Sequence, residues 1–417
     1  MHNIGVICRP GIGHLNPMCV LGQELRRRGH AVTVFGPAEM GGAVANARLP
    51  FEAFGADSDV DGALNRERAA SQSRHGLAAT TARLRFMLGD LQRVFDCAPR
   101  LLRSAGIDLL AVNHLEAGAA TLAHHLGLPF VAVSCAVPVT DEPRIPPFFT
   151  SWAYNEAAWA RLRNVAARRA VSGLWKPLRD RIARQRALWS LPDQWSDGPR
   201  LQLNQLTAEF DFPHERLPAG FHYTGPFQTE SGLEPTLPAS LTFPFEKLDG
   251  KTVVYATLGT LQSGRTTMFE TIARACEGLG VQLVVSLGAP EPGGALPKLS
   301  GSPLTVSYAP HQQLISRADV VITHGGINTV MGALQAATPM VVVPITFDQP
   351  GVGARVARSG AGEVVSLSRL SPPTLRTAVE KVLSQPRYRR RADNARQDVL
   401  RAGGVRRAAD LIEAALP

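Results

Sequence analysis

One stretch, residues 308–349, constrains the fold more than any other part of the chain. Its centre is an apolar, β-branched run, Ala318–Thr323, which predicts a fully buried strand. Six polar or glycine-rich residues follow, and then a helix is predicted over Val330–Ala337. Met340–Val343 predicts the next buried strand. Strands and helices that alternate in this way indicate an α/β architecture.

The turn between the first of these strands and the helix, His-Gly-Gly-Ile-Asn-Thr at 324–329, has the features of an anion site. A helix start offers free backbone N–H groups and the positive end of a dipole. Gly325 and Gly326 let the backbone approach a phosphate without an intervening side chain. Three side chains of the turn can add hydrogen-bond donors: His324, Asn328 and Thr329. An ordinary capped helix start is the simpler interpretation, but Asp348-Gln349 after the next strand adds polar groups and favours a diphosphate site.

This stretch resembles the donor-binding signature of UDP-dependent glycosyltransferases of family 1, which have the two-domain GT-B fold and include bacterial zeaxanthin and macrolide glycosyltransferases. The family signature begins with aromatic-x-Pro-Gln, continues with His-x-Gly-x-Asn-(Ser/Thr) and ends with Asp/Glu-Gln, and its order and spacing match here. The resemblance implies that Tyr308 lies against the uracil ring and that His324 contacts the diphosphate. The other contacts that it implies are to phosphate, from Asn328 and Thr329, and to sugar hydroxyls, from Asp348 and Gln349.

Two residues depart from the family pattern inside the signature. His311 stands where Gln is usual, and it would take that place in the donor site. Gly332, four residues after Asn328, stands where the family commonly has an acidic residue on the ribose hydroxyls. Because glycine has no side chain, that contact is missing or comes from elsewhere. Gln335, on nearly the same helix face, could supply it.

The N-terminal region opens with a βαβ unit that carries a second motif. A strand is predicted over Asn3–Cys8, a glycine turn precedes His14, and a helix over Met18–Arg28 leads to the next strand, Ala31–Phe35. The turn is not a dinucleotide-binding fingerprint, because it lacks a third glycine and an acidic residue at the end of the second strand. It does place an imidazole at the carboxyl end of a strand, beside a crevice.

The same family resemblance extends to this region. Gly-x-Gly-His at 11–14 and Gly-His-x-Val at 29–32 resemble the acceptor domain of these glycosyltransferases. The resemblance implies that His14 is the general base that deprotonates the acceptor hydroxyl, and imidazole titrates near neutral pH, as this role requires. The simpler interpretation is a polar cap on a helix start.

The family commonly has an Asp that orients this histidine, after the strand predicted here over Ile107–Val112, but this chain has Asn113. An amide can hold one imidazole tautomer, but it cannot stabilise an imidazolium by charge. Three interpretations follow. Glu116 or another carboxylate supplies the charge, the acceptor is acidic enough to need little base, or the chemistry has changed or been lost.

The second half of the chain opens with a further glycine turn. The strand predicted over Val253–Ala256 is followed by Thr-Leu-Gly-Thr, which resembles the family loop that lies close to the diphosphate. Thr260 could therefore donate to a phosphate or sugar oxygen. A helix N-cap is the alternative.

A chain of 417 residues with 45% hydrophobic content is long enough for two domains with separate cores. The expected fold class is α/β, with two facing Rossmann-like domains (GT-B) and an interdomain cleft. The chain is expected to end in two helices, Pro372–Leu383 and Tyr388–Ala415. The predicted divisions are an acceptor-binding domain at 1–228, a linker at 229–250, a donor-binding domain at 251–398 and a C-terminal helix at 399–417 that could pack back on the first domain.

The net charge of +9 would suit nucleic acid or an acidic membrane surface, but no nucleic-acid-binding motif is present, and a nucleotide ligand also suits a basic cleft. The segment Arg161–Arg186 is strongly basic and lies among four tryptophans. It either makes a weak contact with a membrane surface or is a helical insertion that packs on the N-terminal sheet.

No apolar stretch is long enough to span a membrane, and the N-terminus lacks the pattern of a signal peptide. Five scattered cysteines without metal-ligand spacing predict reduced thiols in the cytoplasm. No Asp-x-Asp pair with metal-ligand character is present, so neither a metal nor a resident cofactor is expected.

The expected function is therefore transfer of a hexose from a nucleotide diphosphate sugar to a hydroxyl of a lipophilic small molecule. Glucose is the hexose that we expect. UDP-glucose would be the co-substrate, and the reaction would invert the anomeric carbon, with His14 as base. The alternative is a GT-B protein that has lost sugar transfer through Asn113 and Gly332 and acts as an accessory protein or catalyses another reaction in the same cleft.

Overall fold

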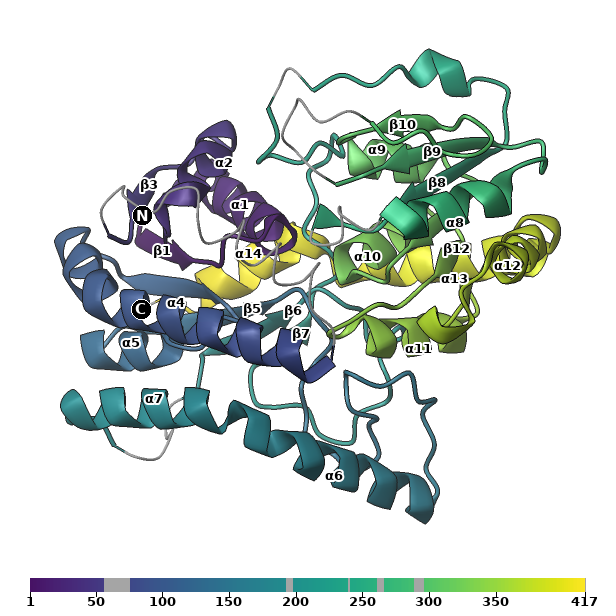
Figure 1. Ribbon diagram of the computed structural model, residues 1–417. Helices are drawn as coiled ribbons and strands as arrows, with labels where there is room; N and C mark the ends of the chain where they lie inside the picture. The colour runs from purple at the N-terminus through teal and green to yellow at the C-terminus, as the bar shows by residue number, and fades with distance from the viewer. Residues whose placement is uncertain (56–75, 193–197, 239–240, 261–265, 289–295, 417) are drawn as a thin grey trace.

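A computed structural model shows two α/β domains side by side, each built on a parallel sheet (Figure 1). The structure describes residues 1–55, 76–192, 198–238, 241–260, 266–288 and 296–416.

The sheet of the first domain has the strand order β3-β2-β1-β4-β5-β6-β7, and all its neighbouring strands run parallel. Its strands are β1 (Asn3–Ile7), β2 (Ala31–Gly36), β3 (Phe51–Ala53), β4 (Leu109–Asn113), β5 (Phe130–Ser134), β6 (Leu201–Asn204) and β7 (Phe221–Tyr223). Its main helices are α1 (Ile12–Arg27), α2 (Gly41–Asn46), α4 (Gly76–Ser104), α5 (Ala119–Leu126), α6 (Ala158–Ser172) and α7 (Lys176–Leu188), with short 3₁₀ turns η1 (Ala38–Met40) and η3 (Gly173–Trp175).

The sheet of the second domain has the order β10-β9-β8-β11-β12-β13, again fully parallel. Its strands are β8 (Val253–Thr257), β9 (Gln282–Ser286), β10 (Leu304–Val306), β11 (Val320–Thr323), β12 (Met340–Val342) and β13 (Gly362–Val364). Its helices are α8 (Thr266–Cys276), α9 (His311–Arg317), α10 (Ile327–Gln335), α11 (Gln349–Ser359), α12 (Pro372–Ser384) and α13 (Pro386–Ala402), and 3₁₀ turns occur at η4 (Phe245–Leu248) and η6 (Leu367–Arg369). A last helix, α14 (Gly404–Ala414), follows α13.

Each sheet is buried on both faces, which explains the nearly continuous apolar runs of its central strands. In β8, Val254 and Ala256 pack on one face against α8 and α12, whereas Val253 and Tyr255 pack on the other face. In each sheet the strand order reverses beside the first strand, between β1 and β4 and between β8 and β11. Ligands of open α/β sheets bind at the carboxyl ends of strands at such points.

Two helices that follow the motifs begin earlier than the sequence predicts, and both begin inside a motif. α1 starts at Ile12 instead of Met18, and α10 starts at Ile327 instead of Val330. First-turn residues face ligands and solvent rather than a core, so apolar periodicity does not reveal them. His14 and Asn328 therefore lie in the first turns of helices, not in loops.

The predicted C-terminal helix Tyr388–Ala415 is wrong as a single element. Gly403 and Gly404 have φ angles of 84° and 59°, a left-handed conformation that ends α13 and starts α14 in a new direction. α13 packs with the second domain through Ala392 and Val399. α14 returns to the first domain, where Ala408, Ala409 and Ile412 join the core under α1. Both chain ends consequently lie on the first domain (Figure 1).

The basic segment forms a separate layer, α6 and α7, at the lower edge of the molecule (Figure 1). α7 packs against helix α4, through Leu178 and Ile182 against Leu91 and Phe95, and not directly on the N-terminal sheet as the sequence had suggested. The loop before α6 holds this helix in place: Asn164 on α6 donates to the carbonyl oxygen of Pro143 in the loop at 2.9 Å.

A buried ion pair joins the two domains. The guanidinium of Arg355 on α11 donates to Asp211 Oδ1 at 2.7 Å, and both side chains are almost fully buried. Burial alone would raise the pKa of Asp211, but Arg355 and His214 outweigh burial and hold that pKa at about 2. The hydroxyl of Tyr223 also donates to this carboxylate, at 2.8 Å.

Candidate active site

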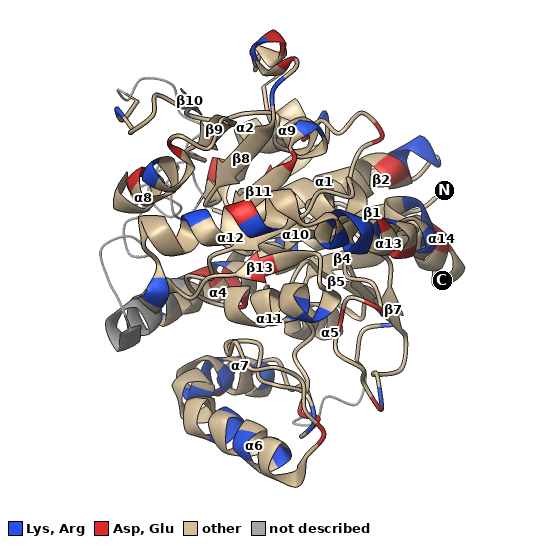
Figure 2. Cartoon of the chain, turned by 90° about the vertical axis from the view of Figure 1, so that its right-hand side faces the viewer, with Lys and Arg blue, Asp and Glu red and all other residues tan. Residues whose placement is uncertain are grey.

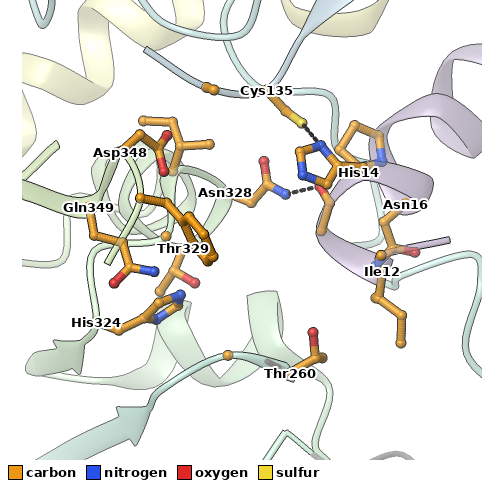
Figure 3. Close-up of a pocket in the computed structure, with 18 of the residues that line it drawn as sticks. Ile12, His14, Asn16, Cys135, Thr260, His324, Asn328, Thr329, Asp348 and Gln349 are labelled. Carbon is orange, nitrogen blue, oxygen red and sulfur yellow. Dashed lines mark hydrogen bonds between the residues drawn. The ribbon is translucent and has the colours of Figure 1, made fainter. Parts of the chain in front are cut away.

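A cavity of about 1130 Å³ lies between the domains, at the carboxyl ends of both sheets. Its volume exceeds that of a typical single-ligand site and suits two ligands side by side. Side chains from both domains point into it (Figure 3). It brings together these residues predicted for the site: His14, Thr260, Tyr308, His311, His324, Gly326, Asn328, Thr329, Asp348 and Gln349. Asn113 and Glu116 do not line it.

His324 is fixed between two glycines that must be glycine. A Cβ on Gly259 or on Gly326 would come within 2.7 Å of its ring. Gly325 next to it has a φ angle of 87°, and Thr323 Oγ1 accepts its N–H at 3.2 Å, which holds the turn at the start of α10. Burial lowers the pKa of His324 to about 4, so the ring is neutral at pH 7. It can therefore donate a hydrogen bond to an anion from a ring N–H group, but it carries no positive charge.

His311 lines the cavity, but both its ring nitrogens are engaged by the protein. Nδ1 lies 2.9 Å from the hydroxyl of Tyr255, and Nε2 lies 3.1 Å from Thr329 Oγ1. Burial lowers the pKa of His311 to about 4, so this chain of bonds is uncharged at pH 7. The residue thus holds Thr329 in place from behind, which the sequence did not indicate.

Gln349 is also held by the backbone. Its Oε1 accepts the N–H groups of Ile345 and Thr346 at 2.9 and 2.8 Å, and its side chain is almost buried. With the carbonyl oxygen occupied, the amide N–H₂ group is what it can offer to a sugar oxygen. Asp348 precedes it at the same edge of the cavity (Figure 3).

Tyr308 receives an unexpected partner from the linker. Its hydroxyl donates to Glu234 Oε2 at 3.2 Å, and both residues line the cavity. Burial raises the pKa of Glu234 to about 7. The sequence treated residues 229–250 as a connection only, because they show no apolar periodicity, yet the linker contributes a carboxyl group to the cavity.

The structure explains the glycine at position 332. A Cβ there would overlap the side-chain amide of Gln312, which lines the cavity from α9. Gln312 therefore fills the space that a longer residue at 332 would need. Gln335, the substitute that the sequence suggested, does not line the cavity.

On the opposite wall, His14 Nδ1 lies 2.9 Å from the sulfur of Cys135 and 3.5 Å from the side-chain nitrogen of Asn113 (Figure 3). The side-chain oxygen of Asn113, Oδ1, accepts the N–H of Leu115 at 3.2 Å, which turns the side-chain NH₂ group toward the histidine. Burial raises the pKa of Cys135 to about 12, so its thiol is protonated. Both neighbours of Nδ1 are hydrogen-bond donors, and they favour the tautomer that carries its proton on Nε2.

Glu116 does not supply the charge that Asn113 lacks within the main cavity. It lines a separate small pocket with Arg9 and Asp90. Burial raises the pKa of Glu116 to about 7, and Arg9 opposes this rise only in part.

His114 is a cavity residue that the sequence analysis passed over. Its ring centroid lies 6.3 Å from that of His14, and its Nδ1 is buried without a hydrogen-bond partner among the described residues. Burial lowers its pKa to about 4. Its position next to Asn113, at the end of a central strand, was the available signal.

One bond crosses the cavity. Asn328, in the first turn of α10, donates from Nδ2 to the carbonyl oxygen of Gly13 at 2.5 Å, beside His14 (Figure 3). The first turns of α1 and α10 are therefore in direct contact, one from each domain.

Among the described residues, no group of three or more His, Cys, Asp or Glu side chains is arranged to hold a metal ion. All five cysteines are free. In the same part of the chain, no helix combines the length and apolar character needed to cross a bilayer.

Comparisons with known proteins cover the whole chain. A model of the C-terminal domain of erythromycin biosynthesis protein CIII-like proteins matches residues 281–406. The zeaxanthin glucosyltransferase of Pantoea ananas is 30% identical over 424 residues, covering 99% of this chain and 96% of the relative.

Two solved structures share the fold. The kitacinnamycin glycotransferase superposes with a TM-score of 0.77 at 20% identity, covering 100% of this chain and 99% of the other. A Streptomyces glycosyltransferase complexed with thymidine diphosphate has a TM-score of 0.65 at 18% identity, covering 99% of this chain and 100% of the other.

Proposed function

Since the chain belongs to glycosyltransferase family 1 and has the GT-B fold that its motifs predict, we propose that it transfers glucose from a nucleoside diphosphate sugar to a hydroxyl of a lipophilic small molecule. The observation that carries this proposal is the single cavity in which the His324–Thr329 turn of one domain faces His14 of the other. The bond between Asn328 and Gly13 holds these two walls together.

The donor half suits a diphosphate. The start of α10 presents backbone N–H groups, and His324 and Asn328 add side-chain donors at the same place. As the bond to the sugar breaks, negative charge develops on the departing diphosphate, and fixed dipoles at this helix start stabilise it. UDP is the favoured nucleotide by the resemblance of the signature, and a thymidine diphosphate complex of a distant structural neighbour makes TDP the second nucleotide to test.

The acceptor half suits a lipophilic molecule. Its wall is formed mainly by apolar side chains: Val137, Val139, Phe148, Phe149, Val171, Leu174 and Trp175. A 30% identical relative is a zeaxanthin glucosyltransferase, which supports both glucose and an apolar acceptor. The acceptor hydroxyl attacks the anomeric carbon in one displacement, the configuration inverts, and the hydroxyl proton passes to His14 Nε2.

The two hydrogen-bond donors beside His14 Nδ1, from Asn113 and Cys135, affect this proton transfer. Before Nε2 can accept the proton, the ring must take its other tautomer, in which Nδ1–H faces the sulfur of Cys135. A thiol sulfur is a weak acceptor. We therefore expect base catalysis to be weaker here than in a histidine–carboxylate pair.

The decisive experiment is a panel of UDP- and TDP-sugars with carotenoid, polyketide and phenolic alcohols, read by mass spectrometry and by nucleotide release. A glucosylated product with an inverted anomeric centre supports the proposal. Nucleotide binding without release for every acceptor would instead favour an accessory protein, the function that the Asn113 amide beside His14 would explain. Absence of nucleotide binding would contradict both. The five free thiols fit a reducing cytoplasm, where nucleotide sugars are made, and location there is part of the proposal.

A further inference from the structure

The layer formed by α6, η3 and α7, residues 158–188, has a large excess of positive over negative charge. It contains nine Lys or Arg residues and one acidic residue, Asp180, which corresponds to eight of the nine net positive charges of the whole chain. The layer lies at the lower edge of the molecule in both views (Figures 1 and 2), and Lys and Arg mark its ribbons with blue bands in Figure 2. Arg168 and Arg186 turn inward and bond to backbone carbonyls, and Arg181 donates to Gln92 on α4. Four of the nine basic residues are exposed at the surface: Arg169, Lys176, Arg179 and Arg184.

An exposed apolar stripe runs along α6 between these charges. Trp159 and Leu162 are 59% and 72% exposed, and exposed alanines follow at 166 and 170. A spacing of three or four residues places them on one helix face. Arg163 and Arg169 flank the stripe, and the Arg163 guanidinium lies 5.2 Å from the Trp159 ring centre. Leu188 at the end of α7 is 77% exposed.

The acceptor end of the cavity opens beside this stripe. Val171, Leu174 and Trp175, at the junction of α6 and η3, line the cavity. Leu174 and Val139 both line it and are 38% and 73% exposed, so they lie at its mouth. The mouth is thus apolar and borders a surface that is both apolar and cationic.

We propose that the α6–α7 layer docks on the surface of a bilayer that contains anionic lipid and that a lipophilic acceptor enters the cavity from this bilayer. Trp and Leu side chains would enter the headgroup region, and the arginines would meet lipid phosphates, as in other interfacial helices. A second copy of the chain is a poorer occupant, because it would bring an identical set of cations against these. Because no described helix can cross a bilayer, the contact is peripheral. Only the route of the acceptor rests on the proposed function; docking itself does not.

Docking is tested by co-sedimentation with vesicles of phosphatidylcholine alone and of phosphatidylcholine with phosphatidylglycerol, without donor or acceptor. The intact protein should bind the anionic vesicles at low salt and release them as salt rises. Arg169→Glu with Arg184→Glu should weaken binding about tenfold or more, and Trp159→Ser with Leu162→Ser should weaken it comparably without changing the charge.

The matched control is Arg390→Glu with Arg407→Glu, two exposed arginines on α13 and α14. It changes the net charge by the same amount outside the layer and should leave binding within about twofold of the parent. Equal loss in the control, or equal binding to neutral vesicles, would overturn docking through α6 and α7. A third outcome would also overturn it: the parent is a dimer in sedimentation equilibrium, and Trp159→Ser with Leu162→Ser dissociates the dimer but leaves vesicle binding unchanged.

The acceptor route has its own readout. With an acceptor embedded in anionic vesicles, the Trp159→Ser, Leu162→Ser variant should lose turnover in proportion to binding, whereas turnover with a water-soluble acceptor should be unchanged. Equal loss with both acceptors would refute the route. If the protein binds vesicles but transfers no sugar, the proposal of a docking surface stands and only the proposed function is refuted.

Discussion

The two walls of the cavity hold their functional groups in different ways. On the second-domain wall, which is the donor wall of the proposed function, three polar side chains are fixed by the protein itself: His324 lies between two glycines, Thr329 contacts His311, and Gln349 accepts two backbone N–H groups. On the first-domain wall, which is the acceptor wall of the proposed function, an amide and a thiol lie beside His14 Nδ1. The three side chains of the donor wall are therefore preorganised, whereas the tautomer of His14 depends on the two groups beside Nδ1.

The largest effect is expected on the acceptor wall. His14→Ala should lower kcat by about 10²- to 10⁴-fold through loss of the base and leave nucleotide affinity unchanged. Turnover numbers and calorimetric titration with UDP test the two parts. His114→Ala is the matched control, since it removes the same ring type 6.3 Å away in the same cavity. Unchanged turnover in His14→Ala, together with a loss in His114→Ala, would transfer the base role to His114.

The donor wall should respond in affinity. Asn328→Ala removes a donor to the diphosphate and the bond to Gly13, and we expect nucleotide binding to weaken about 10- to 100-fold. Gln335→Ala removes an amide at the other end of α10, outside the cavity, and should have no effect. If both variants bind UDP like the parent, the nucleotide does not lie at the start of α10.

The hydrogen bonds of the neutral His311 ring predict that the stability of the protein depends on pH. The pKa of His311 is about 4 in the folded protein, below its ordinary value of 6.5. As pH falls from 6.5 to 4, the unfolded chain gains a proton at this ring and the folded chain does not, so the free energy of unfolding decreases.

His311→Gln removes this term and leaves the other histidines in place. Between about pH 7.5 and about pH 5, the variant should therefore gain about 2 kcal/mol of stability relative to the parent. Urea unfolding at both pH values measures the difference. A parallel change in the two proteins would show that His311 is protonated in the folded state.

The smallest effect concerns the tautomer of His14. Asn113→Asp provides an acceptor for Nδ1–H and leaves Nε2 ready to take a proton, so kcat should rise about tenfold. ¹⁵N chemical shifts of the ring should report a change from the Nε2–H to the Nδ1–H tautomer. Asn204→Asp, an equally buried amide at the end of β6, serves as control for burying a carboxylate. An unchanged tautomer would mean that Asn113 does not determine it.

The sequence predicted the parts of the molecule in which residue type and local pattern are enough. The apolar runs of the central strands gave the two parallel sheets, and the signature at 308–349 gave most of the donor wall. It missed two edge strands of three residues each, β3 and β13, because so few residues carry no periodicity.

Contacts between segments distant in the chain could not be predicted. Cys135 beside His14, Glu234 on Tyr308 and Gln312 in the space next to Gly332 all depend on how separate elements meet. For the same reason the sequence placed a carboxylate, Glu116, near the base, whereas the fold directs it into another pocket.

The two glycines at 403 and 404 have a consequence for synthesis on the ribosome. They direct the last helix back to the first domain, where Ala408 and Ile412 complete a core that residues of β1 and α1 begin. The core of the first domain therefore stays incomplete, with an apolar groove exposed, until α14 has been translated. At about 5–20 residues per second, this delay lasts on the order of ten seconds or more. A nascent chain of this type is thus expected to expose this apolar groove until α14 has been synthesised.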